Sequence, residues 1–115
     1  MPIIEGAGRF EAPPATARYA EQLRTDDLSA GTYSIATGGQ DRQSPHTEDE
    51  IYVVTAGSAT FVDDAGSVPI TVGDVLFVRA GVEHRFVDIT EDLALVVVFA
   101  PAEGTRACPP APIKG

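Results

Sequence analysis

The chain has 115 residues, of which 43% are hydrophobic and 22% are charged, as is usual for one soluble globular domain. Its net charge of −9 disfavours binding to nucleic acid or to anionic membranes, and no cluster of Lys and Arg offers a local exception. The apolar run Leu93 to Ala100 is too short to span a bilayer. Because residues 1–10 have no basic region followed by an apolar one, we expect a cytoplasmic protein without a signal peptide.

The first thirty residues are weakly patterned, and we interpret residues 1–30 as an N-terminal segment that packs on the domain behind it. Pro13-Pro14 interrupts regular structure, because proline fixes φ and lacks a backbone donor. The following stretch, Arg18 to Thr25, fits either an edge strand or a short helix.

Residues 31–100 predict a series of short β-strands. Runs such as Ile51 to Thr55 are rich in β-branched and aromatic residues, which favour strands. Asp63-Asp64-Ala65-Gly66 and Gly73-Asp74 have the composition of tight turns. Turn signals about every ten residues, without a competing helical period, predict an all-β sandwich or barrel.

The last predicted strand is apolar on both faces, with Leu95 and Val97 on one side and Val96 and Val98 on the other. One side can fill a barrel, whereas the other needs a second sheet layer, the N-terminal segment or a second subunit to cover it. This need leads us to expect a homodimer.

Residues 101–115 contain four prolines and two glycines, and we interpret them as a tail that crosses a surface or stays disordered. Cys108 in this tail is the only cysteine, so it cannot form an internal disulfide. We interpret it as an incidental free thiol.

The sequence has two histidines, and each lies at the edge of a predicted strand. His46 lies shortly before Glu50 in the sequence, and His84 follows a loop that contains Gly81. Two imidazoles and one carboxylate form a ligand set that suits iron(II) and related metals and leaves coordination positions open.

The segment Gly39 to Gly57 resembles the first cupin motif. Glu50 matches the motif glutamate, and His46 matches its second histidine at the shorter spacing. Ser44 stands where the motif has its first histidine.

The segment Gly73 to Asp88 resembles the second cupin motif, because Gly73, Gly81 and His84 match it in register. Arg79 stands where that motif has proline, and Asp88 where it has asparagine. With the two motifs in order, the resemblance covers residues 31–100 and implies a double-stranded β-helix, or jelly-roll, barrel.

The resemblance further implies that His46, Glu50 and His84 point inward and hold one divalent ion, such as Fe, Mn, Ni or Zn. Side chains alternate along a strand, so Tyr52 turns inward together with Glu50, and Phe86 together with His84. The expected result is a small-molecule pocket with its polar groups at the metal end.

The missing first histidine leaves three interpretations open, because serine is a poor metal ligand. The site works with three protein ligands and water, or Gln43 or Gln40 supplies an amide oxygen, or the site is degenerate and empty.

Further candidate residues carry open alternatives. Tyr33 and Tyr52 are candidates for proton transfer in the pocket. Arg79 either binds an anionic substrate or faces solvent. Glu48 either holds His46 or is solvated, and the second interpretation is favoured.

The leading functional hypothesis is a metal-dependent enzyme acting on a small molecule, either dioxygenase-like or isomerase- or lyase-like. An isomerase usually needs a protein base, and the absence of a third histidine favours oxygen chemistry slightly. The alternative is a non-catalytic small-molecule-binding or structural cupin with a degenerate metal site.

Overall fold

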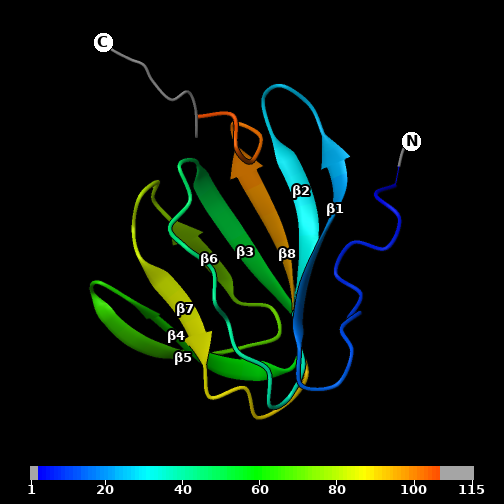
Figure 1. Cartoon of the computed structure of the whole chain (residues 1–115), viewed down its shortest axis with the longest axis vertical. Coiled ribbons are helices and arrows are strands. Elements are labelled where there is room, and N and C mark those ends of the chain that lie inside the picture. The colour runs from blue at the N-terminus through cyan, green and yellow to red at the C-terminus, as the bar shows by residue number, and fades with distance from the viewer. Residues whose placement is uncertain (1–2, 107–115) are drawn as a thin grey trace.

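A computed structural model describes residues 3–106, which form eight β-strands in two antiparallel sheets (Figure 1). The strands are β1 (Ala17–Arg24), β2 (Ser29–Ile35), β3 (Asp49–Ala56), β4 (Ser58–Asp63), β5 (Gly66–Thr71), β6 (Val75–Val78), β7 (His84–Val87) and β8 (Leu93–Ala100). One sheet has the order β1-β2-β8-β3-β6 and the other β5-β4-β7. The described residues contain no helix, so the predicted all-β barrel is confirmed. The stretch that begins at Arg18, for which the sequence allows an edge strand or a short helix, belongs to the edge strand β1.

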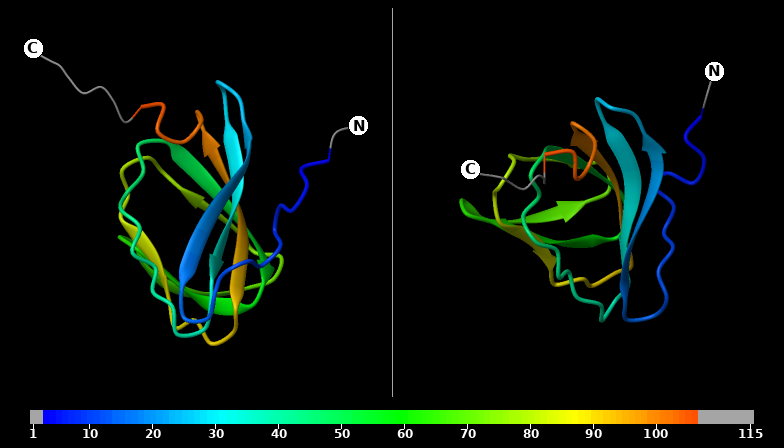
Figure 2. Two further views of the ribbon diagram at one scale, coloured as in Figure 1. Left: turned by 45° about the vertical axis from the view of Figure 1, so that its right-hand side comes forward. Right: turned by 45° about the horizontal axis from the view of Figure 1, so that its top comes forward.

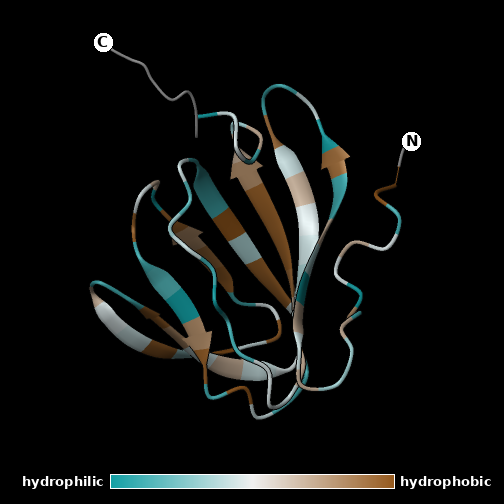
Figure 3. Cartoon of the chain, viewed as in Figure 1, coloured by the Kyte–Doolittle hydropathy of each residue, from teal (hydrophilic) through white to brown (hydrophobic). Residues whose placement is uncertain are grey.

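Strand β3 shows how the sequence pattern fixes the two faces of the larger sheet. Glu50, Tyr52 and Val54 are buried in the barrel, whereas Ile51 between them is 42% exposed on the outer face. Figure 3 shows bands of differing hydropathy along β3, while β8 is apolar throughout. Tyr52 pairs with Val97 on one side and with Leu76 on the other, so inward side chains of three strands lie in one row.

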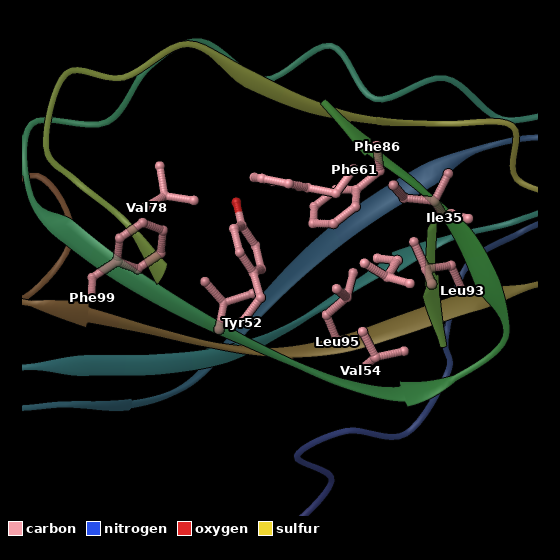
Figure 4. Close-up of a cluster of buried hydrophobic side chains, with 12 residues drawn as sticks. Ile35, Tyr52, Val54, Phe61, Val78, Phe86, Leu93, Leu95 and Phe99 are labelled. Carbon is pink, nitrogen blue, oxygen red and sulfur yellow. The ribbon is translucent and has the colours of Figure 1, made fainter. Parts of the chain in front are cut away.

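The interior is filled by apolar side chains from both sheets (Figure 4). Phe86 of β7 lies edge-on to Tyr52, with ring centroids 5.0 Å apart, and it also contacts Phe61 of β4. The predicted inward directions of Tyr52 and Phe86 are confirmed, since each is 1% exposed. This packed core fixes the directions of the strands that carry the polar end of the barrel.

The N-terminal segment lies along the outer face of the larger sheet, beside β1 and β2 (Figure 2). Gly8 donates its N–H to the Thr32 hydroxyl, and the Thr55 hydroxyl donates to the Gly8 carbonyl. A Cβ added at Gly8 would lie 3.2 Å from the Val96 side chain, so Val96 lies close to this glycine. The N-terminal segment therefore covers part of the outer apolar face of β8, which the sequence predicts to need a cover.

Residues 36–48 join β2 to β3 and pass between β7 and β1, across the open side of the barrel (Figure 1). Asp41, near the middle of this segment, accepts hydrogen bonds from the Tyr33 hydroxyl at 2.6 Å and from the Phe86 N–H at 2.8 Å. Tyr33 belongs to one sheet and Phe86 to the other. One buried carboxylate thus ties the two sheets together where no strand pairing joins them.

Candidate metal centre and adjoining cavity

Three predicted ligands converge at one end of the barrel. Glu50 Oε1 lies 3.0 Å from His84 Nε2 and 3.4 Å from His46 Nδ1, and one ligand atom from each residue lies within 4.8 Å of the others. Such separations suit donor atoms that share one ion, because bonds of about 2.1 Å at right angles place neighbouring donors about 3 Å apart.

Each ligand is placed by a different element. Glu50 is near the start of β3, between Val78 of β6 and Phe99 of β8, and His84 begins β7. His46 belongs to the crossing segment 36–48, and its carbonyl accepts the N–H of Gly81 at 2.8 Å. This bond joins the two motif segments, so the ligands that are distant in sequence meet at the same place.

The donor atoms are buried, and three of them lack a hydrogen-bond partner among the described residues. Glu50 is 2% exposed and His84 7%, and neither Glu50 oxygen nor His46 Nδ1 makes a hydrogen bond with the described residues. Buried polar atoms without partners are rare in native proteins, because each one costs free energy. A divalent cation would give these atoms a partner and would also take His84 Nε2, so the donor set fits the metal that the sequence implies.

The ring of His84 is oriented by its second nitrogen. His84 Nδ1 lies 2.9 Å from the Val82 carbonyl, which can only accept, so Nδ1 carries a proton. The lone pair of neutral His84 is then on Nε2, the nitrogen that faces Glu50. Hydrogen bonds of this kind commonly fix the tautomer of a metal-ligating histidine.

The charges of the three groups support one another. Burial alone would raise the pKa of Glu50, but the His46 and His84 imidazoles outweigh it and lower this pKa from 4.5 to about 2. Interaction with Glu50 raises the pKa of His46 above 6.5. Burial opposes the charged form of His84, yet Glu50 and the Val82 carbonyl raise its pKa above 6.5 as well.

The two tyrosines predicted for proton transfer lie near this cluster. The Tyr52 hydroxyl is 2.9 Å from His84 Nε2 and 3.1 Å from Gln43 Oε1, and the Tyr33 hydroxyl donates to Asp41. Burial raises the pKa of both phenols far above 10, so both stay protonated at neutral pH.

A cavity of about 650 Å³ adjoins the cluster. His46 and Tyr52 form its metal end, and Val97 and Phe99 form an apolar wall. Tyr19 also lines the cavity, and its buried hydroxyl has no hydrogen-bond partner in the part of the chain that the structure describes. The remaining lining residues are Ala15, Thr16, Ala17, Arg18, Tyr33, Gly38, Gln40, Arg42, Gln43 and Glu103. A volume of this size and mixed polarity suits a small molecule.

The other residues that the sequence predicts for the site have different surroundings in the structure. Gln43 contacts Tyr52 and lines the cavity, whereas the oxygen of Gln40 accepts from Arg42. Ser44 is exposed. Arg79 is also exposed and is absent from the cavity lining among residues 3–106. Cys108 lies outside the described residues.

The solvated interpretation of Glu48 is wrong, because this residue is 1% exposed. Its carboxylate accepts the backbone N–H groups of Gly104 and Arg106, each at 2.9 Å, and the Thr47 hydroxyl. Burial opposes its charge, but these hydrogen bonds prevail and lower the pKa of Glu48 below 4.5. Glu48 therefore fastens the segment that follows β8 onto the barrel.

Sequence reasoning also missed Asp41 and Glu103. Neither belongs to a motif, and each acts through contacts with residues far away in the chain. Glu103 Oε2 lies 3.3 Å from His46 Nε2, on the side of the ring away from Glu50. The carboxylate comes from the stretch that the sequence marks only as a tail.

Residues 31–100 match the sequence profile of the family described as Cupin domain. This chain belongs to the cupin family. The match spans both motif segments and the strands around them, so the resemblance expected from the sequence is confirmed. Cupins often bind metal, and this cupin has a His-Glu-His cluster that could hold an ion.

The cupin has relatives in sequence and in structure. It is 40% identical over 85 residues to an uncharacterised protein of Streptomyces coelicolor, covering 74% of this chain and 81% of that protein. An RmlC-like cupin from Shewanella frigidimarina is 20% identical, with a TM-score of 0.71, covering 88% of this chain and 89% of that one. KdgF from Halomonas is also 20% identical, with a TM-score of 0.68, covering 79% of this chain and 84% of that one. At these identities the two structures show the shared fold alone. Residues 3–106 contain no helix suited to crossing a membrane.

Proposed function

We propose that this cupin is a metal-dependent enzyme that acts on a small molecule in the 650 Å³ cavity. One observation carries the proposal: His46, Glu50 and His84 bring buried donor atoms to one point beside that cavity, and three of these atoms have no other partner among residues 3–106. A bound Fe, Mn, Ni or Zn ion would supply Lewis-acid chemistry or, for a redox metal, chemistry with dioxygen.

Of the three interpretations of the site, the best supported is a centre with three protein ligands. Water or substrate would fill its open positions. Gln40 is engaged by Arg42, and Ser44 is exposed. The oxygen of Gln43 accepts from the Tyr52 hydroxyl, so this amide is held one hydrogen bond away from His84. In this arrangement Gln43 and Tyr52 orient groups at the open side of the centre.

A dioxygenase-like reaction is better supported than an isomerase- or lyase-like one. Tyr33 and Tyr52 have raised pKa values, so in the metal-free protein they donate hydrogen bonds and do not act as bases at neutral pH. Each phenol can hold an oxygen atom of a substrate in the cavity. This is a positioning role, and it does not require the phenol to lose its proton.

Metal analysis of protein purified without an affinity tag tests the proposed centre. We expect one equivalent of a transition metal in the native protein and its loss in the double variant His46→Ala, His84→Ala. Equal trace metal in both samples would contradict the ligand assignment.

Dioxygen uptake by iron(II)-loaded protein tests the proposed reaction class, with a panel of enols, thiols and catechols as substrates. Uptake that depends on both substrate and protein is expected, and the double histidine variant is the control. Stoichiometric metal without uptake across the panel would favour the second candidate, a non-catalytic small-molecule-binding cupin. A site that takes up no metal would indicate a structural cupin.

We also propose that the protein is a homodimer in the cytoplasm. The N-terminal segment leaves part of the outer sheet face uncovered, and Ile51, Val75 and Phe77 there are 42%, 64% and 60% exposed. All three lie on β3 and the edge strand β6, a position that suits packing against a second copy. Light scattering after size exclusion should give twice the monomer mass, and a monomer at micromolar concentration would contradict the dimer. Cell fractionation tests the location.

A further inference from the structure

We propose that Glu103 is a positioning residue of the metal centre, which accepts a hydrogen bond from His46 Nε2 and thereby directs His46 Nδ1 at the ion. This inference rests on the proposed metal-binding function and goes beyond the three expected ligands. It assigns a role to a residue in the segment after β8.

The two nitrogens of His46 face two different carboxylates. Nδ1 lies 3.4 Å from Glu50 Oε1, and Nε2 lies 3.3 Å from Glu103 Oε2. The ring also packs on Phe99, with centroids 4.7 Å apart, which limits its rotation. His46 is therefore placed between the buried centre and the Glu103 carboxylate.

This placement selects one tautomer of His46. A neutral imidazole that binds an ion through Nδ1 keeps its proton on Nε2. A carboxylate beside Nε2 stabilises that proton and makes the ring a better ligand, as in the carboxylate–histidine–metal arrangements of other proteins.

The geometry also makes the two histidines differ. His84 Nδ1 donates to the Val82 carbonyl, so His84 offers Nε2 to the ion, whereas His46 offers Nδ1. One centre would thus hold its ion through opposite nitrogens of its two histidines.

Glu103 is held in place by its backbone. Its N–H donates to the Ser29 hydroxyl at 2.9 Å, and its carbonyl accepts from Arg24 at 2.8 Å. The buried carboxylate of Glu48 then binds the N–H groups of Gly104 and Arg106. These four backbone contacts fix the segment from which the Glu103 side chain reaches His46.

Glu48 is between His46 and Glu50 in the sequence. The stretch that supplies two ligands therefore also supplies the anchor for the segment that carries Glu103. This arrangement couples the position of residues 103–106 to the geometry of the centre.

Zinc binding by three single variants tests the inference, with Glu103→Ala, Glu103→Gln and the exposed control Glu5→Gln measured by competition with a chromophoric chelator. Glu103→Ala should weaken zinc binding about tenfold to a hundredfold, as expected when such a partner is removed. Glu103→Gln should lose less, because its amide oxygen still accepts from Nε2. Glu5→Gln should bind as the wild type does.

The tautomers provide a readout that a purely structural role would not change. The protein has two histidines, so nitrogen-15 imidazole spectra of the zinc-loaded protein contain two rings to assign. We expect zinc on Nδ1 of His46 and on Nε2 of His84, with a changed His46 tautomer balance in metal-free Glu103→Ala. Melting temperatures confirm that each variant is folded.

The outcomes separate this inference from the proposed function. Zinc binding by the wild type with equal affinity in Glu103→Ala and Glu5→Gln, or with Nε2 of both histidines on the ion, overturns the role of Glu103 alone. Absence of zinc binding in the wild type overturns the metal centre and the inference together.

Discussion

The Tyr52 hydroxyl lies 2.9 Å from His84 Nε2, the one nitrogen of that ring with a free lone pair when the ring is neutral. In the metal-free protein with a neutral His84, the phenol can thus donate to the lone pair that a metal ion would need. The other neighbour of the hydroxyl is Gln43 Oε1 at 3.1 Å, which can accept the phenol proton when an ion takes Nε2. The hydroxyl has a single proton, so a bound ion would leave that proton to Gln43 Oε1 alone.

Tyr52→Phe should accordingly separate stability from metal binding. Loss of the hydroxyl should lower the free energy of unfolding of the metal-free protein by about 1 kcal/mol, because Gln43 loses its donor. Zinc affinity should stay the same or rise a few-fold, since a competitor for His84 Nε2 is removed. Denaturant unfolding and chelator competition measure the two quantities, and a tenfold loss of affinity would show that Tyr52 supports the centre directly.

The cluster predicts opposite pH dependences for the metal-free and zinc-bound proteins. Without metal, Glu50 contributes stability that is present above pH 4.5 and is lost as the pH falls towards about 2. The histidines contribute stability that is complete below pH 6.5 and is lost as the pH rises through their raised pKa values. The contribution of the cluster should thus be greatest between pH 4.5 and 6.5.

Zinc binding requires neutral imidazoles, so it should strengthen as the pH rises. Below the raised pKa values of His46 and His84, up to two protons leave per ion, and the association constant should change by up to about a hundredfold per pH unit. Thermal unfolding with and without zinc, from pH 5 to pH 8, measures both trends. A zinc-induced shift in melting temperature that shrinks as the pH rises would contradict this ligand set.

Asp41→Ala should weaken the closure of the barrel. The substitution leaves the Tyr33 hydroxyl and the buried Phe86 N–H without their acceptor, at a cost of about 2–4 kcal/mol in the free energy of unfolding. Asp64→Ala, in an exposed turn, is the matched control and should change stability by less than about 0.5 kcal/mol. Equal unfolding midpoints in denaturant for the two variants would show that Asp41 does not hold the sheets together.

Gly57→Ala should be more damaging than Gly81→Ala. Both glycines have positive φ, +78° and +82°, which disfavours a side chain in either place. A Cβ at Gly57 would also collide with the Asp92 backbone carbonyl, whereas one at Gly81 meets open space. We expect a cost of about 2 kcal/mol or more at Gly57 and about 1 kcal/mol at Gly81, measured by thermal unfolding.

Much of the fold was predictable because it depends on local pattern. Alternation along β3 places Glu50 and Tyr52 on one face, and turn residues separate the strands. The two motif segments add the cupin resemblance, which implies the three proposed ligands that the structure brings together. Strand parity then gives the correct inward direction of Phe86.

The supporting residues were not predictable, because each depends on contacts between distant parts of the chain. Glu48 stands in a charged run that suggests a solvated position, yet its partners Gly104 and Arg106 come from a proline-rich stretch. Asp41 and Glu103 have no local pattern that reveals their partners, Phe86 and His46. A single buried carboxylate gains its role only after the chain has folded.

The crossing segment 36–48 carries His46, whereas Glu50 and His84 belong to strands. Two donors are therefore rigid parts of the sheets, and the third lies on irregular backbone at the open side of the barrel. A displacement of that segment alone would admit or release an ion without separating any paired strands. The speed of metal exchange in this cupin should accordingly follow the local opening of residues 36–48, and not the global unfolding of the protein.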